Sequence, residues 1–340
     1  MDEATSAFPI INDRYQILNT ISTGGMSVIY RAKDMILDRE IALKILKRDL
    51  SQQKDFRDQF TTEAKSTARL SHPNIVTTFD FGFYGDRLFI AMELIDGFLL
   101  KSIITDGGIS FKQRFQYIVQ ACKGLAYAHE SKIIHCDIKP QNMLVSKAGM
   151  LKLTDFGISR ALDTISRQSH TEEIWGSPFY IAPEIAKGEP PSLASDVYSL
   201  GIVMYELFTK QLPFTGHDVL TLVEKHLVEK PTPPKTINPE IPDILNSIIL
   251  KTIEKNEKNR YHAAHDLLLA LNKVDVLESS DEVQEKEGVS EIVSAVENAE
   301  IQVSNQQDVD WKTIILGFLM LILVGGLIPF WLFIYYSINR

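Results

Sequence analysis

Two short stretches decide the fold of this chain: HCDIKPQN at residues 135–142 and DFG at residues 155–157. Together they supply four polar side chains within 19 positions, namely Asp137, Lys139, Asn142 and Asp155. The apolar residues between them predict two strands, 142–145 and 150–154, whose hairpin brings Asn142 close to Asp155. Phosphoryl transfer needs this combination of metal-binding oxygens, a carboxylate at the attacking hydroxyl and a cation on the phosphate. The alternative, an ordinary hairpin with polar capping residues, does not explain all four side chains.

A glycine-containing turn lies upstream, in ISTGGMSVIY at residues 21–30. Small residues in such a turn let backbone N–H groups approach phosphates closely. By itself the turn is usually only part of a hairpin. Further along the chain, Lys44 lies in the alternating strand 40–46, where it is placed to neutralise phosphate oxygens, and Glu63 in the amphipathic helix 56–70 is placed to pair with it.

The predicted elements are unevenly distributed along the chain. Strand-like segments come first, at 15–22, 27–34, 40–46, 75–84 and 87–94. Helical patterns dominate afterwards, at 111–131, 195–209, 220–228, 241–251 and 263–272. Strands followed by helices predict an α+β fold with two unlike lobes.

These motifs resemble those of eukaryotic-like serine/threonine protein kinases, most closely the bacterial, membrane-anchored type. The resemblance covers residues 15–271. Its motifs occur in the family's order, namely the glycine-rich loop, Ala-x-Lys at 42–44, Glu63, the catalytic loop 135–142, Asp-Phe-Gly at 155–157 and Ala-Pro-Glu at 182–184. The resemblance implies a bilobal protein kinase fold, with a small antiparallel β-sheet N-lobe at 15–92 and a helical C-lobe at 97–272. ATP is then expected to bind between the lobes.

The resemblance also implies a role for each reactive residue. Asp137 orients the substrate hydroxyl or accepts its proton, and Lys139 stabilises the transferring phosphoryl group. Asn142 and Asp155 bind Mg²⁺, with Mn²⁺ as an alternative ion. A lysine two positions after the catalytic aspartate is typical of the serine/threonine branch of the family.

The implied nucleotide-binding residues form a longer set. They are Ile21, Ser22, Thr23, Gly24, Gly25, Met26 and Ser27 in the glycine-rich loop, then Ile29, Ala42, Lys44, Glu63, Met92, Glu93 and Ile95. Within this set, Lys44 holds the α- and β-phosphates and pairs with Glu63. Met92 is the gatekeeper at the back of the nucleotide site, while the Glu93 carbonyl and the Ile95 amide bond the adenine. Ile29 and Ala42 cap the adenine ring.

Three residues outside this set are expected to support the site. Asp196, in SDVYSLG at 195–201, resembles the family's buried aspartate that braces the catalytic loop. Arg260 resembles the arginine that pairs with the glutamate of the Ala-Pro-Glu motif, which is Glu184 in this chain.

The chain departs from the family pattern in two loops. Ser22 and Ser27 replace the first and third glycines, and a Cβ at position 22 is expected to weaken nucleotide binding by about 1 kcal/mol. Cys136 replaces an arginine that normally binds a phosphate on the activation loop, and a thiol cannot form that bidentate pair. We therefore hypothesise that activity does not depend strictly on phosphorylation of this loop. Its hydroxyl residues are Thr164, Ser166, Ser169 and Thr171.

The negative charge of the chain is concentrated in one segment. The formal net charge is −9, and residues 275–310 alone hold eleven acids and one lysine, a net charge of −10. The rest of the chain holds 34 basic and 33 acidic residues, a net charge of +1, so no nucleic-acid partner is predicted. Two cysteines supply neither a disulfide framework nor a zinc ligand set.

Residues 313–336 contain no charged side chain across 24 positions. At about 1.5 Å per residue a helix there spans roughly 36 Å, more than the roughly 30 Å hydrocarbon core of a bilayer. This predicts a single C-terminal transmembrane helix, and a buried core helix is the alternative. The expected organisation is a tail at 1–14, the kinase domain at 15–272, an acidic flexible linker at 273–311, the transmembrane helix at 313–336 and a short extracytoplasmic tail at 337–340.

The resemblance implies a membrane-tethered serine/threonine protein kinase that uses ATP and Mg²⁺ and also phosphorylates itself. Its expected partners are proteins bearing serine or threonine and the membrane, and self-association into a homodimer is left open. The expected location is the cell membrane, with a single pass and a cytoplasmic kinase domain, because ATP is cytosolic. One alternative is a pseudokinase scaffold that binds nucleotide without efficient turnover, and another is a small-molecule phosphotransferase of the same fold. The complete reactive set argues against the first, and the Ala-Pro-Glu segment argues against the second.

Overall fold

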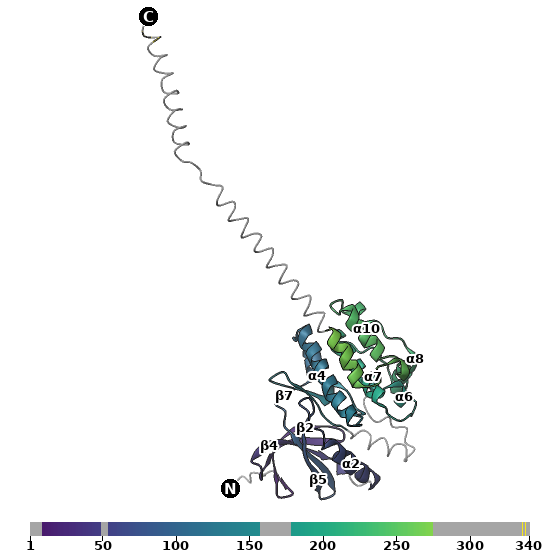
Figure 1. The fold of residues 1–340 in the computed structure, drawn as a ribbon. Helices are drawn as coiled ribbons and strands as arrows, with labels where there is room; N and C mark the ends of the chain where they lie inside the picture. Colours follow the sequence, from purple (N-terminus) through teal and green to yellow (C-terminus); the bar gives the residue numbers. More distant parts are fainter. Residues whose placement is uncertain (1–8, 49–53, 157–177, 275–334, 336, 338–340) are drawn as a thin grey trace. The chain divides into compact units, whose positions relative to one another are not determined.

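The computed structural model describes residues 9–48, 54–156, 178–274, 335 and 337. The chain divides into two compact units, residues 1–276 and 277–340, and nearly all described residues belong to the first (Figure 1). Within the described residues, no helix combines the length and the apolar character needed to cross a bilayer. Residues 273 and 274 of the predicted linker belong instead to the helix at 264–274, where Val274 is buried. The rest of the predicted linker, and all but two residues of the predicted membrane span and tail, lie outside the described residues.

The N-lobe is built on a six-stranded antiparallel sheet with the strand order β1-β2-β3-β4-β6-β5. Its strands are β1 (Ile10–Ile11), β2 (Tyr15–Thr23), β3 (Ser27–Asp34), β4 (Arg39–Leu46), β5 (Thr78–Tyr84) and β6 (Arg87–Glu93). One helix, α2 (Lys54–Thr67), lies beside this sheet (Figure 1). Phe56 and Phe60 of α2 pack against Leu46 and Leu88, so apolar burial attaches the helix to the sheet.

The C-lobe is mostly helical and carries a small antiparallel sheet. Its helices are α3 (Leu100–Asp106), α4 (Phe111–Glu130), α6 (Pro183–Ala186), α7 (Leu193–Thr209), α8 (Val219–Val228), α9 (Pro234–Ile237) and α10 (Asp243–Thr252), and residues 264–274 are also helical. The sheet has the order β7 (Gly97–Leu99), β8 (Met143–Ser146), β9 (Leu151–Leu153). Short 3₁₀ turns are η1 (Pro140–Asn142), η2 (Pro178–Tyr180) and η3 (Glu257–Asn259). The predicted two-lobed α+β fold is confirmed.

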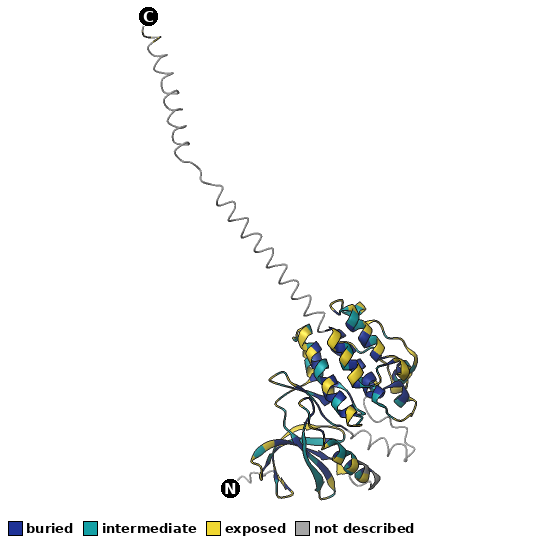
Figure 2. Cartoon of the chain, viewed as in Figure 1, coloured by how far each residue is buried: buried dark blue, intermediate teal, exposed yellow. Residues whose placement is uncertain are grey.

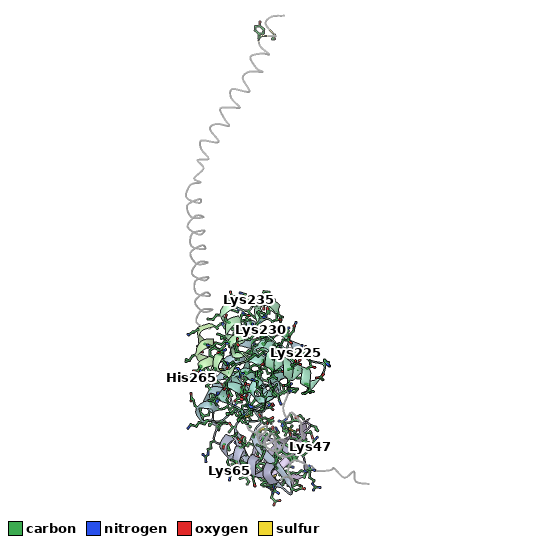
Figure 3. All side chains as sticks on the ribbon, turned by 90° about the vertical axis from the view of Figure 1, so that its right-hand side faces the viewer. Lys47, Lys65, Lys225, Lys230, Lys235 and His265 are labelled. Atoms are coloured by element: carbon green, nitrogen blue, oxygen red, sulfur yellow. The ribbon has the colours of Figure 1, made fainter. Side chains whose placement is uncertain are left out.

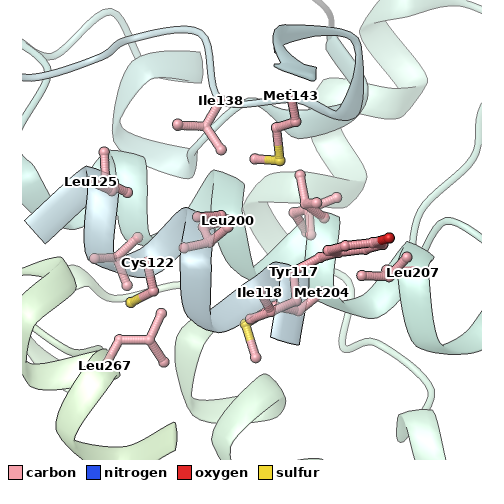
Figure 4. Close-up of a cluster of buried hydrophobic side chains, with 14 of the residues drawn as sticks. Tyr117, Ile118, Cys122, Leu125, Ile138, Met143, Leu200, Met204, Leu207 and Leu267 are labelled. Carbon is pink, nitrogen blue, oxygen red and sulfur yellow. The ribbon is translucent and has the colours of Figure 1, made fainter. Parts of the chain in front are cut away.

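Helix α7 forms the centre of the C-lobe core, and nearly all of its residues are buried. Leu200 and Met204 of α7 face Cys122 and Leu125 of α4 across this core, while Leu267 closes it from the last described helix (Figure 4). The buried residues of α4 belong to the same core as α7, and α4 also carries exposed positions (Figure 2). Complete burial raises the pKa of the Cys122 thiol, which makes this cysteine a packing residue.

One predicted strand starts later than expected. The apolar alternation predicts a strand from residue 75, whereas β5 begins at Thr78. The preceding residues pair with β9 instead: the Leu153 N–H donates to the Asn74 carbonyl at 2.9 Å, and the Val76 N–H donates to the Leu153 carbonyl at 2.8 Å. The segment before β5 therefore joins the two lobes.

Charged side chains are spread over both lobes. Figure 3 labels Lys47 and Lys65 on the N-lobe, and Lys225, Lys230 and Lys235 on the C-lobe. Lys225 pairs with Glu229 at 3.4 Å and Lys235 pairs with Asp243 at 2.6 Å. The basic residues of this face are thus interleaved with acids.

Gly124 lets α4 approach the segment that joins the lobes. A Cβ at Gly124 would lie 2.7 Å from the Asn74 carbonyl oxygen, closer than real contacts allow.

Gly124→Ala gains about 1 kcal/mol of helix propensity, but displacing a packed backbone costs about 1–3 kcal/mol. We expect a net loss of folding free energy, measured by urea unfolding. The exposed neighbour Lys123→Ala is the control, expected within about 0.5 kcal/mol of the unmodified chain. A Gly124→Ala variant as stable as this control contradicts the close contact.

Candidate active site

The catalytic loop is attached to one buried carboxylate. Asp196, in the first turn of α7, is 2% exposed and accepts hydrogen bonds from the His135 N–H at 2.7 Å and the Cys136 N–H at 2.9 Å. Cys136 has φ of 66°, a left-handed conformation that is costly for a residue with a Cβ. The two bonds to Asp196 hold the loop in this conformation. The predicted role of Asp196 agrees with this geometry.

Asp196 is itself oriented by His129 of α4. The His129 Nε2 lies 3.0 Å from an Asp196 oxygen, and its Nδ1 accepts the Ala264 N–H at 3.2 Å. Because Nδ1 acts as an acceptor, Nε2 carries the proton and donates to the carboxylate. The support of the catalytic loop therefore extends to the last described helix.

His135 links the catalytic loop to the Asp-Phe-Gly stretch. Its Nδ1 accepts the Asp137 N–H at 3.2 Å, and its Nε2 donates to the Thr154 carbonyl at 3.0 Å. Burial lowers the pKa of His135, so the ring is neutral. Both nitrogens are used within the fold, and the ring packs against Phe156 at 4.3 Å between centroids. His135 therefore holds the two motifs together.

Three predicted residues converge on the catalytic loop. Lys139 Nζ lies 2.8 Å from one Asp137 carboxylate oxygen and 2.6 Å from the other. Asn142 Nδ2 donates to the Asp137 carbonyl and to its carboxylate, each at 2.8 Å. Pro140 starts the 3₁₀ turn that orients Asn142, whose carbonyl accepts the Thr154 N–H at 3.0 Å. A carboxylate, an ammonium and an amide are thus fixed within one hydrogen-bonded group.

The second pair of charges joins the lobes. Lys44 Nζ of β4 donates to the Asp155 carboxylate at 2.7 Å, and the two side chains are 8% and 22% exposed. Burial by itself raises the pKa of Asp155, but the nearby Lys44 charge and hydrogen bond, with a smaller contribution from the Lys139 charge, lower it overall. Asp155 is therefore ionised and suited to hold a cation.

The predicted partner of Lys44 differs from the observed one. Within the described part of the chain, Lys44 makes its ion pair with Asp155 and not with Glu63. A cavity of about 30 Å³, room for one water molecule, lies beside Asp155 and is lined by Ala64 and Thr67 of α2. The α2 residues Ala64 and Thr67 thus face a small cavity beside Asp155, and the Asp155 carboxylate holds the lysine.

An apolar cluster, which we call the apolar slot, joins residues of β4, β6 and β8. Ala42 and Met92 are buried there, and Ile29, Ile95 and Leu144 pack against them. The structure brings four predicted nucleotide-binding residues together in this slot. Sequence reasoning missed Leu144, although the alternation of β8 turns Met143 and Val145 inward and Leu144 to the opposite face.

The glycine-rich loop connects β2 to β3 and is closed by a bond from the Gly24 N–H to the Ser27 carbonyl at 2.8 Å. Ser22 pairs with Ile29 across the strands, directly after an irregularity in the register between Thr20 and Ser22. Met26 contributes its side chain as well as its backbone. Its side chain packs against the cluster of Phe56 and Phe60 on α2, which joins the loop tip to that helix.

A buried ion pair stabilises the C-lobe beside the site. Arg260 donates two hydrogen bonds of 2.8 Å to the Glu184 carboxylate, as predicted. Ser195 adds a third at 2.7 Å. Burial by itself raises the pKa of Glu184, but the bonds from Arg260 and Ser195 lower it overall. The remaining guanidinium N–H groups donate to backbone carbonyls, which satisfies the buried charge.

Comparison with known proteins adds independent observations. The family model described as "Protein kinase domain" matches residues 15–269. The serine/threonine-protein kinase PrkC of Bacillus subtilis is 41% identical over 258 residues, which cover 76% of this chain and 40% of PrkC. PknB of Mycolicibacterium smegmatis is 38% identical over 270 residues, covering 78% of this chain and 43% of PknB. The chain thus spans about two fifths of the length of these curated relatives.

A solved structure shows the same fold. The PknI kinase domain of Mycobacterium tuberculosis superposes with a TM-score of 0.65 at 21% sequence identity. The match covers 79% of this chain and 99% of that structure.

Proposed function

The chain belongs to the protein kinase family, and from this membership we propose that it transfers the γ-phosphate of ATP to serine and threonine hydroxyls of proteins. The observation that carries the proposal is the group formed by Asp137, Lys139 and Asn142, which hydrogen bonds of 2.8 Å hold together. The relatives PrkC and PknB bear the name serine/threonine-protein kinase.

The apolar slot suits a purine, and the lysine suits phosphate. A flat ring between Ala42 and Leu144 buries apolar surface on both faces. The Ile95 N–H donates no hydrogen bond within the described residues and is available to a ring nitrogen. Lys44 lies two residues after Ala42 on β4 and donates to Asp155, so its charge is placed to neutralise phosphate oxygens.

The residues Asp155 and Asn142 fit a magnesium ion. Mg²⁺ prefers hard oxygen ligands and takes one or two protein groups, with the remaining positions filled by water and phosphate. Asp155 offers an ionised carboxylate. The Asn142 amide nitrogen is used by Asp137, which leaves its oxygen for the ion. When bound, the ion neutralises phosphate charge.

Asp137 is the group that receives the substrate hydroxyl. Its carboxylate is only partly shielded, at 16% side-chain exposure, and is held in position by Lys139 and Asn142. A hydroxyl that donates to this carboxylate is oriented toward the phosphate. Its proton can pass to the carboxylate as the new P–O bond forms and the bond from the γ-phosphorus to the departing ADP oxygen breaks. Lys139, beside it, stabilises the charge of the transferring group.

The test is phosphate incorporation by the full-length chain. Incubated with γ-labelled ATP, Mg²⁺ and a serine- and threonine-containing protein, it is expected to label both the substrate and itself. Acid hydrolysis should release phosphoserine or phosphothreonine. Nucleotide binding without incorporation would favour the pseudokinase, and labelled small molecules without labelled protein would favour the other phosphotransferase.

Activity is expected to tolerate loss of the activation-loop hydroxyls. Cys136 lacks the donors that pair with a phosphate. A phosphate on the activation loop therefore finds no arginine at this position of the catalytic loop. A variant with alanine at Thr164, Ser166, Ser169 and Thr171 should keep turnover within about tenfold. These four residues lie outside the described residues. A loss of about 100-fold or more, in the range typical for a removed transition-state contact, contradicts the hypothesis.

Membrane tethering is a separate proposal, supported by the 24 uncharged positions of residues 313–336. The kinase domain would face the side that contains ATP, and confinement near the membrane, with or without self-association there, would favour membrane-bound substrates. The chain should remain in the membrane fraction after alkaline carbonate washing. If a chain ending at residue 275 restored the full pattern of cellular phosphorylation at equal abundance, the anchor would be dispensable.

A further inference from the structure

Glu93 is fixed at the point where the N-lobe sheet ends. It is the last residue of β6, and its N–H donates to the Thr77 carbonyl at 2.9 Å. Its carboxylate accepts the Thr77 N–H at 3.2 Å and Lys152 Nζ at 3.0 Å. Because the N–H and the side chain of one residue are held at once, the Cα of Glu93, from which its carbonyl projects, is fixed in orientation.

Lys152 reaches this carboxylate because of the register of β9. The residues on either side of it point into the C-lobe core, so strand alternation turns Lys152 to the opposite face, directly across from Leu144 of the apolar slot. The bonds from Leu153 to Asn74 and from Val76 to Leu153 hold β9 against the segment before β5. The position of the ammonium group is therefore set by the backbone of both lobes.

A second lysine–acid pair provides a comparison. Lys147 Nζ lies 2.8 Å from the Asp96 carboxylate, just beyond Glu93 along the connecting segment. The side chains of Lys147 and Asp96 are 67% and 78% exposed, whereas those of Lys152 and Glu93 are 13% and 29% exposed. Water screens the exposed pair, so it contributes little. The shielded pair keeps its strength and restrains both partners.

We propose that Lys152 is a positioning residue for purine recognition. Through the Glu93 carboxylate it sets the direction in which the Glu93 carbonyl and the Ile95 N–H face the apolar slot. The inference rests on the proposed function, in which those two backbone groups bond the adenine. Lys152 acts on nucleotide binding and not on the transfer step, because the reacting groups Asp137 and Lys139 belong to a different loop.

The test compares variants of both partners in the full-length chain, with adenosine as a phosphate-free probe. Lys152→Met keeps an apolar stem over Leu144 and removes the charge. It should raise the adenosine Kd and the KM for ATP about five- to tenfold, the equivalent of about 1–1.4 kcal/mol, while kcat at saturating ATP changes less than about twofold. Lys152→Arg should restore both values.

Glu93→Gln should raise the adenosine Kd equally, and the double variant should add nothing, because each change removes the same pair. Lys147→Met, the matched control, should change Kd less than about twofold.

Three results overturn the inference. One is an unchanged adenosine Kd in Lys152→Met, and another is an equal effect in Lys147→Met. The third is a loss of kcat at unchanged KM, which places Lys152 at the reacting end of the cleft. If Lys152→Met does not fold, Glu93→Gln answers the same question from the other partner. If the unmodified chain binds no adenosine, the proposed function is overturned together with this inference. If the unmodified chain binds adenosine but Lys152→Met binds it equally well, only the role of Lys152 is overturned.

Discussion

Replacing Asp137 with asparagine is expected to lower kcat for protein phosphorylation about 10³-fold, the range typical of a lost catalytic base. The asparagine side chain has the same shape and can still meet Lys139 and Asn142, which surround this position at 2.8 Å or less. It cannot accept the hydroxyl proton, because an amide oxygen is far less basic than a carboxylate. The measurement is steady-state incorporation of labelled phosphate at saturating ATP.

Nucleotide binding separates this loss from misfolding. The apolar slot and Lys44 do not involve Asp137, so the Kd for ADP and Mg²⁺ should remain within about threefold of the unmodified chain, a difference under 1 kcal/mol. Asp38→Asn, at an exposed turn of the N-lobe, serves as a control of equal chemistry and should keep full activity. Retention of more than a tenth of the activity in Asp137→Asn contradicts the role assigned to this carboxylate.

Arg260→Met is expected to destabilise the C-lobe by about 3–5 kcal/mol, the usual cost of leaving one member of a buried ion pair alone. Glu184 would lose two hydrogen bonds and keep only that of Ser195, in a place with almost no access to water. For a domain of this size the loss corresponds to a fall in Tm of roughly 10 °C. Urea unfolding at pH 7 measures the free energy directly.

The pH dependence gives the same prediction a second readout. In the unmodified chain the pKa of Glu184 is lowered below its usual 4.5, so its contribution to stability is complete above that pH and is lost as the pH falls through the lowered value. Without Arg260, burial raises the pKa of Glu184 instead, and protonation relieves the variant as the pH falls. The stability difference between the two chains should therefore shrink from pH 7 to pH 4. A difference that stays constant with pH, or below about 1 kcal/mol at pH 7, contradicts the buried pair.

Glu184→Met combined with Arg260→Met tests the origin of the loss. Removing both charges leaves no unpaired group, so the double variant should be more stable than Arg260→Met alone. A double variant that is less stable shows that packing around Arg260, and not the isolated charge, dominates.

The local features of this fold could be predicted from the sequence because they depend on spacing along the chain. The alternation around Lys44 and the short interval between Asp137 and Asn142 determine where these side chains lie. The pairing of Glu184 with Arg260, 76 residues apart, became predictable only through resemblance to a family, because no local pattern connects two such distant residues.

Other features could not be predicted because they depend on packing between distant elements. In the described part of the chain Lys44 pairs with Asp155 and not with Glu63, and this pairing arises only when strand β4 and the Asp-Phe-Gly stretch of the other lobe come together. The contact of Met26 with α2 and the place of Leu144 in the slot likewise arise only when the lobes are assembled. The late start of β5 has the same origin, since its expected first residues bond with β9 of the other lobe.

The bond between His129 and the Ala264 N–H has a consequence for how the domain can be shortened. The same residue is held a second time, because the Cys122 thiol donates to the Ala264 carbonyl at 3.1 Å. A chain trimmed before Ala264 would lose the N–H that His129 accepts. His129 would then no longer hold Asp196 in its orientation, and Asp196 would no longer hold the backbone of Cys136 in place. Deletions at the end of the domain should thus impair turnover as well as remove Leu267 from the core, and the shortest competent version is expected to extend through the helix at residues 264–274.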